Sequence, residues 1–375
     1  MRAIDALDSL WPRILAGTPP PAGLDAARWE GLADRAQAHG LGAALSIALK
    51  RAGTWPDLPS TTRERLDAQQ RAATLRALQW RATLQRVLDA LAPAGIVPVA
   101  YKGAALAFLT YPDAAMRPMV DLDLWLDAEQ MRTAAARLQT LGFAPESKTT
   151  RPDAWQEQHE GEIKLRHPVH GLVELHWGVF AGEWLKHATR IDRAAVRGRV
   201  REVRLFQRPL RVLAARDHLI QVALHATISN RLSLSAMRCL LDVALLAREI
   251  DDWPTVLRDL RDWRVARSVG HVFALSAELF GDAALQQAAR ELAAQHSPRW
   301  LYRHIDAQDV LQRRGLRQSW KRWTYLLCAA DRRRDALRLL LHTLWPSRSW
   351  LLQRYGAGGL RWRLRHVASA LRGEI

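Results

Sequence analysis

An alternation of acidic and apolar residues in the segment DLDLWL, residues 121–126, constrains this chain more than any other feature. In a β-strand, alternate side chains point to the same face, so Asp121 and Asp123 would project together with their Cα atoms about 7 Å apart. The opposite face would be apolar and carry Val120, Leu122, Leu124 and Leu126. The pattern therefore predicts a half-buried strand whose open face bears two neighbouring carboxylates.

Two carboxylates held side by side repel each other, and this repulsion raises the pKa of one of them unless a cation lies between them. Hard divalent cations such as Mg²⁺ prefer carboxylate oxygens and usually complete their coordination shell with water and substrate phosphates. Paired metal ions bound in this way stabilise both the attacking and the leaving oxygen in phosphoryl transfer. A solvated strand face without a metal is the alternative interpretation of the same two residues.

Two further segments favour the metal interpretation. The segment GLVELHW, residues 171–177, also alternates, so Glu174 could deliver a third carboxylate to the same face of the sheet. Upstream, residues 96–101 (IVPVAY) are predicted to form a buried strand, which the Lys102-Gly103 pair joins to a short helix. The N–H groups and the dipole of a helix N-terminus favour phosphate. The order of these elements predicts a nucleotide site with bound metal.

The sequence on either side of this α/β unit has the three- and four-residue apolar spacing of helices. Before it, the spacing predicts a long helix that opens with a capping box at Thr61 and Glu64 and stops at Pro93 and Gly95. After it, the pattern is helical again from about Arg211. We therefore expect an α+β fold in which a small mixed β-sheet core is embedded between mainly helical N- and C-terminal regions.

This pattern divides the chain into four regions. They are an N-terminal helical region (1–95), the α/β core (96–210), a helical domain (211–306) and a basic helical C-terminal segment (307–375). Within the core, we expect Asp127 and Gln130 to cap the helix that follows the acidic strand. Segments 161–168 and 171–180 are predicted to form a hairpin, and REVRLF, residues 201–206, is predicted to be the last strand.

Charge and cysteine content bear on partners and compartment. The formal net charge is +17, and from residue 301 onward 16 basic residues stand against 5 acidic ones. Trp345, Trp350 and Trp362 lie among these arginines, so the segment could bind nucleic acid or a membrane surface, or simply pack the last helices. The sequence has only two cysteines, no apolar run long enough to span a membrane and no signal-peptide pattern. We expect a cytoplasmic protein without a transmembrane segment.

The motifs YKGAALAFLTYPDAAMRPMVDLDLWLD and GLVELHW resemble those of the bacterial uncharacterised nucleotidyltransferase family within the polymerase-β-like superfamily. The resemblance implies that Asp121, Asp123 and Glu174 are catalytic and bind two Mg²⁺ ions, with Mn²⁺ as the alternative, and that Glu174 accepts the proton of the incoming hydroxyl. It also implies nucleotide binding around the glycine turn by Lys102, Gly103, Ala104 and Arg117. Ala104 stands where the superfamily usually has Ser or Gly, and Glu174 replaces the commoner Asp.

The resemblance continues in the helical segment LIQVALHATISNRLSLSAMRCLLDVALLAREIDDWPTVLRDL, where it implies that His225 and Asp242 line the cleft. His176 shares the strand face of Glu174, so it is a candidate for supporting the metal ligands or contacting the acceptor. The implied activity is Mg-dependent transfer of a nucleoside monophosphate from an NTP to an unknown acceptor, with release of pyrophosphate. The alternative is a non-catalytic helical scaffold, or a protein that binds nucleic acid through its basic C-terminal segment and keeps an inactive nucleotidyltransferase-like module.

Overall fold

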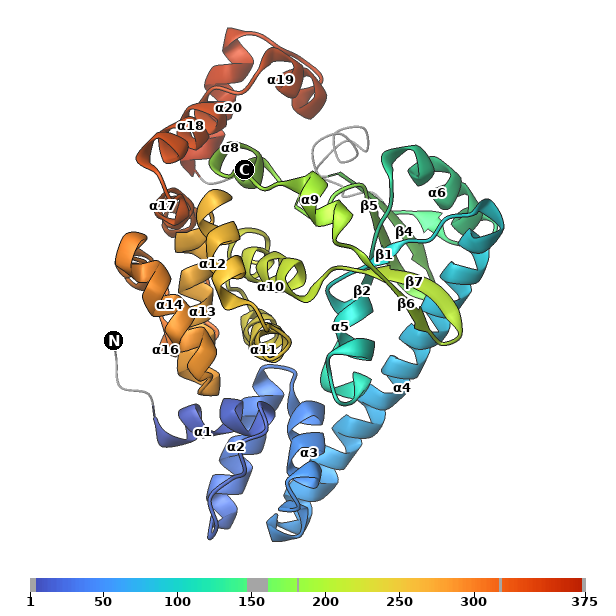
Figure 1. Ribbon diagram of the computed structural model, residues 1–375, viewed down its shortest axis with the longest axis vertical. Coiled ribbons are helices and arrows are strands. Elements are labelled where there is room, and N and C mark those ends of the chain that lie inside the picture. The colour runs from blue at the N-terminus through green and yellow to red at the C-terminus, as the bar shows by residue number, and fades with distance from the viewer. Residues whose placement is uncertain (1–4, 147–160, 181, 317–318, 373–375) are drawn as a thin grey trace.

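Within the part of the chain that the structure describes, a seven-stranded mixed sheet is surrounded by helices (Figure 1). The computed structural model describes residues 5–146, 161–180, 182–316 and 319–372. The strands are β1 (Val99–Ala100), β2 (Asp121–Trp125), β3 (Ala144–Pro145), β4 (Glu162–His167), β5 (Gly171–His176), β6 (Arg201–Leu205) and β7 (Arg208–Val212). Their order in the sheet is β3-β4-β5-β2-β1-β7-β6. The expected α+β fold is confirmed.

Strand β2 lies in the middle of the sheet, between a parallel partner, β5, and an antiparallel one, β1. On its core face Leu122, Leu124 and Leu126 are buried, as the alternation predicts. Val120 is 67% exposed, so its predicted place on that face is wrong. The reason is that pairing with β5 begins only at Asp121, which leaves the preceding residue outside the sheet.

The last two strands form a hairpin that the sequence reveals only in part. Strand β6 falls within the predicted segment 201–206, but the chain then turns at Phe206 and Gln207, which both have positive φ, and returns as β7. The predicted return to helix at Arg211 is therefore wrong, because residues up to Val212 pair in parallel with β1. Phe and Gln are not typical of tight turns, so no local signal marks this one.

Among the residues described from 5 onward, four α-helices precede the sheet: α1 (Ala6–Leu15), α2 (Ala26–Ala38), α3 (Gly42–Arg51) and α4 (Ser60–Leu91). The long helix α4 packs against α3 and also against β7, so it joins the N-terminal helices to the sheet (Figure 1). The predicted capping box does not form, because α4 begins at Ser60 and Thr61 already lies inside its first turn. The predicted stop is confirmed, since a short 3-10 turn follows α4 and ends at Gly95, where φ is 67°.

Helix α5 (Gly103–Leu109) lies between β1 and β2 in the chain, and α6 (Met131–Gln139) lies between β2 and β3. Helix α5 begins at the predicted glycine turn. Asp127 does not cap the segment that leads into α6, because its side chain makes no hydrogen bond to the backbone there. It forms an ion pair with Arg197 of α9 (Arg193–Gly198) instead, so the predicted cap is wrong.

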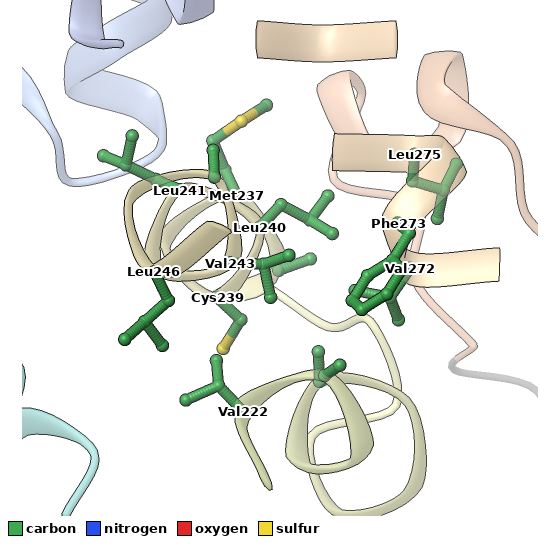
Figure 2. Close-up of a cluster of buried hydrophobic side chains, with 14 of the residues drawn as sticks. Val222, Met237, Cys239, Leu240, Leu241, Val243, Leu246, Val272, Phe273 and Leu275 are labelled. Atoms are coloured by element: carbon green, nitrogen blue, oxygen red, sulfur yellow. The ribbon is translucent and has the colours of Figure 1, made fainter. Parts of the chain in front are cut away.

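The helices after the sheet share a hydrophobic core. They are α10 (Ala215–Leu224), a π-helical turn (His225–Ser229), α11 (Ala236–Ala247), α12 (Trp253–Asp262), α13 (Ala266–Phe280) and α14 (Ala283–Gln295). Figure 2 shows Val222 of α10, Cys239 of α11 and Phe273 of α13 meeting in this core. Cys239 is a buried core thiol, whereas Cys328 is half-buried.

Short helices form the C-terminal segment: α15 (Arg299–Tyr302), α16 (Ala307–Leu311), α17 (Ser319–Ala329), α18 (Arg333–Leu344), α19 (Arg348–Tyr355) and α20 (Leu360–Arg372). Helix α18 packs against α8 (Glu183–Ala188), and α18 to α20 lie at one end of the molecule (Figure 1). Among the described residues, no helix is long and apolar enough to cross a membrane. The division into four regions stays a prediction.

Candidate functional site

The parallel register of β2 and β5 places Asp123 opposite Glu174 and Trp125 opposite His176. His176 Nε2 lies 3.0 Å from Asp123 Oδ1 and 3.5 Å from Glu174 Oε2. The acids and the histidine are buried, and one ligand atom from each lies within 4.8 Å of the other two. Two predicted acids and His176 therefore meet at one point, where they could hold a metal ion.

His176 favours the ionised form of both acids. Burial alone would raise the pKa of Asp123, but the Lys102 ammonium and the hydrogen bond with His176 hold it far below the usual range. Glu174 is also buried, yet its hydrogen bond with His176 contributes to lowering its pKa to about 2. Burial would lower the pKa of His176, whereas its contacts with the two carboxylates raise it. Both acids therefore stay ionised.

Asp121 lies on the same face of β2 but is paired with Leu172 rather than with an acid. The group of three ligands within 4.8 Å does not include it. Burial, followed by the negative charges of Asp123 and Glu174, raises the pKa of Asp121 to about 6. The repulsion that the sequence predicts between neighbouring carboxylates is therefore present, and it falls on Asp121.

Two lysines neutralise the acids, and the sequence motifs identify only one of them. Lys102 Nζ lies 2.8 Å from Asp123 Oδ1. Lys164, on β4, forms an ion pair with Glu174 and lies 3.3 Å from Glu162 Oε1. Because Lys164 is paired directly opposite Glu174 in the β4–β5 ladder, it shares the acidic face. The alternation in GEIKLRH, read as a hairpin strand, is the signal that could have identified Glu162 and Lys164.

The donor set fits a divalent cation. Asp123 and Glu174 supply carboxylate oxygens, which both Mg²⁺ and Mn²⁺ accept. The imidazole of His176 is more typical of transition metals, or of a group that orients the carboxylates from outside the coordination shell. A bound cation would take over from the Lys102 ammonium as the charge that balances the buried acids.

The Lys102-Gly103 turn that precedes α5 is tightly held. Lys102 has φ 48° and ψ −128°, a conformation that residues with side chains rarely adopt, and its N–H donates to His218 Nε2 at 2.9 Å. A Cβ at Gly103 would lie 2.6 Å from Arg117 Nη1, so a side chain there requires the arginine to move. Ala104 is fully buried in the core beside the sheet. The predicted glycine turn is therefore packed against Arg117.

Arg117 and Asp242, which the sequence assigns to separate roles, are partners. Arg117 Nε and Nη2 donate to the two carboxylate oxygens of Asp242 at 2.8 Å each, and the Tyr111 hydroxyl donates to Asp242 Oδ1 at 2.7 Å. The ion pair is buried and joins the segment before β2 to helix α11. Its direct effect is to fix Arg117 beside the glycine turn.

A cavity of about 1010 Å³ adjoins the acidic site. Lys102, Glu174 and His176 line one part of it, and His225 lines it from the start of the π-helical turn. Burial and the nearby Lys102 lower the pKa of His225 to about 3, so this histidine is neutral. The C-terminal helices supply further lining residues: Arg322, Trp323, His342, Trp350, Arg354 and His366. Of these residues the sequence singles out only Trp350, because no motif connects the others.

Comparison with known proteins agrees with the motifs. A family model described as an uncharacterised nucleotidyltransferase matches residues 25–281. This range contains the seven described strands and the acidic group, whereas α14 to α20 lie beyond it. No curated protein and no solved structure matches the chain significantly.

Proposed function

Because this chain belongs to the uncharacterised nucleotidyltransferase family, we propose that it is a metal-dependent enzyme that transfers a nucleoside monophosphate from an NTP to an acceptor and releases pyrophosphate. The observation that carries this proposal is the buried group of Asp123, Glu174 and His176 beside a cavity. The order of glycine turn, acid pair and third acid, which resembles that of polymerase-β-like nucleotidyltransferases, supports the same reaction.

In this proposal Asp121, Asp123 and Glu174 would hold Mg²⁺, or Mn²⁺ in its place. The metal would supply positive charge to the phosphates and to the reacting oxygens. Glu174 has a pKa of about 2, which suits a permanently ionised ligand better than a proton acceptor. His176 positions two of the carboxylates through its contacts with Asp123 and Glu174.

The lysines have a second role in the same proposal. Lys102 and Lys164 pair with the acids and also line the cavity, so both ammonium groups are within reach of a ligand there. When a divalent cation neutralises the carboxylates, these ammonium groups become available to the phosphates of the nucleotide. The cavity, at about 1010 Å³, is at the upper end of the range for ligand sites, which leaves room for both a nucleotide and an acceptor.

Isothermal titration of ATP, GTP, CTP and UTP, each with and without Mg²⁺, tests the metal and nucleotide site. We expect Mg-dependent binding in the wild type and a loss of at least about tenfold in Asp123→Asn, because a buried metal ligand is removed. Asp89→Asn is a matched control, since it removes an exposed acid that pairs with Arg208. Equal binding by the wild type and Asp123→Asn would refute the proposal.

A transfer assay tests the reaction itself. Each α-labelled NTP is incubated with the protein, Mg²⁺ and a cell lysate, and the products are separated to find a labelled acceptor. We expect label transfer with the wild type and with Asp89→Asn, and no transfer with Asp123→Ala. Mg-dependent binding without any transferred label from the four nucleotides would favour an inactive nucleotidyltransferase-like module.

A further inference from the structure

Two C-terminal helices expose apolar stripes. On α18, Leu337, Leu341 and Trp345 follow one another at four-residue intervals, the last of them directly after the end of the helix. On α20, Leu360 and Leu364 have the same spacing. All five side chains are at least half exposed. Because residues four apart lie on one side of a helix, each helix presents a continuous apolar stripe to the surroundings.

The two stripes belong to one surface, which we call the α18/α20 surface. The helices pack against each other, and the Arg363 guanidinium of α20 lies 4.8 Å from the ring centre of Trp345. Arginines occupy exposed positions directly beside the leucines or within one turn of them: Arg334, Arg338, Arg361 and Arg365. In Figure 1 both helices lie at one end of the molecule, away from the sheet.

The charge on this surface has a single sign. From residue 336 to residue 373 the sequence contains no acidic residue. Asp335, at the start of α18, is 1% exposed and forms an ion pair with the buried Arg264. On these two helices, the exposed arginines of the α18/α20 surface therefore have no exposed acidic neighbour. The surface is both apolar and positively charged.

We propose that the α18/α20 surface docks onto membranes that contain anionic lipids. Helices that combine exposed leucine and tryptophan with arginine bind in the plane of a bilayer interface, where the apolar side chains enter the acyl boundary and the guanidinium groups reach the lipid phosphates. The binding is peripheral. Since Leu339 and His342 of α18 line the cavity, docking would hold the cavity close to the membrane.

Other occupants fit this surface less well. A second copy of the chain, joined through the same surface, would bring arginines towards arginines without acids between them, which is unfavourable. A nucleic acid would satisfy the arginines through its phosphates but would leave Leu337, Leu341, Leu360 and Leu364 exposed to water. An anionic lipid surface satisfies both the charge and the apolar area.

Vesicle co-sedimentation with the full chain tests this proposal independently of nucleotidyl transfer. The probes are vesicles of phosphatidylcholine alone and vesicles that also contain phosphatidylglycerol, at physiological ionic strength. We expect the protein to bind the anionic vesicles at least about tenfold more tightly, and we expect the double variant Leu341→Asn/Leu364→Asn to lose most of this binding. Leu75→Asn/Leu78→Asn is a matched control, because these leucines of α4 are similarly exposed and lie outside the α18/α20 surface.

Three results would overturn the proposal. One is equal binding to neutral and anionic vesicles, or binding to neither. Another is unchanged binding of Leu341→Asn/Leu364→Asn, together with salt-sensitive binding of duplex RNA or DNA that competes with the vesicles, which would assign the surface to nucleic acid. The third is a dimer of the wild type in light scattering that becomes a monomer in the leucine variant, which would assign the surface to self-association.

Discussion

The substitution Asp242→Asn tests the buried framework behind the candidate site. Asp242 accepts two hydrogen bonds from Arg117 at 2.8 Å and one from the Tyr111 hydroxyl at 2.7 Å. The Asp242 side chain is 1% exposed, and the Arg117 side chain is 7% exposed. The chain offers a matched control, because Asp89 accepts two hydrogen bonds from Arg208 at 2.6 Å each, while the Asp89 side chain is 56% exposed. The two ion pairs share their geometry and differ in burial.

Burial determines the expected size of the effect. Asparagine keeps the shape of Asp242 and still accepts the Tyr111 hydrogen bond, but it leaves the Arg117 guanidinium as an unpaired charge away from water. Removing one partner of a buried ion pair costs about 3 to 5 kcal/mol, so we expect Asp242→Asn to lower the free energy of unfolding by that amount. Asp89→Asn should change it little, because solvent screens the arginine that remains.

Urea denaturation, followed by tryptophan fluorescence and by circular dichroism, measures the free energy of unfolding of each variant. The double variant Arg117→Met/Asp242→Leu removes both charges and should recover a large part of the loss. Equal destabilisation by Asp242→Asn and Asp89→Asn would refute the reasoning from burial. A double variant no more stable than Asp242→Asn would show that the unpaired charge is not the main cause of the loss.

Two further predictions concern the site itself. Because the pKa of Asp121 is raised from 3.8 to about 6, its ionisation opposes folding as the pH rises through this range. Without divalent cations, Asp121→Asn should therefore unfold like the wild type near pH 4 but be up to about 3 kcal/mol more stable at pH 8, and a destabilised variant at pH 8 would contradict this. At Lys102, glycine and alanine both remove the ion pair with Asp123, but only glycine relieves the positive φ. Lys102→Gly should be more stable than Lys102→Ala by about 1 kcal/mol in thermal melting, and equal stabilities would show that the turn is not strained.

Local patterns predict the elements of the core well. The alternation at residues 121–126 is enough to identify β2 and its buried face, and the glycine turn identifies the start of α5. Strand β1 falls within the predicted segment 96–101, but β7 and its parallel pairing with β1 are harder to predict, because the turn at Phe206 and Gln207 has no characteristic residues. The capping box at Thr61 also fails, since α4 begins one residue before it, at Ser60, and no side chain caps this end.

The sequence by itself determined which side chains share a strand face, because the two-residue period of a strand is a local property. It thereby determined that Asp121, Asp123 and Glu174 are candidates for one site. The same alternation in β4 could have identified Glu162 and Lys164 as further candidates. Tertiary structure alone decided which of these groups meet. The β2–β5 register sets Glu174 and His176 beside Asp123 rather than beside Asp121.

The same distinction applies to the rest of the site. The pairing of Arg117 with Asp242, across more than a hundred residues, and the lining of the cavity by the C-terminal helices both depend on contacts between distant segments. Periodicity specifies which face of an element is buried, but it carries no information about which other element covers that face. The sequence therefore determined the chemical groups available to this protein, and only packing between distant segments decided which of them face one another.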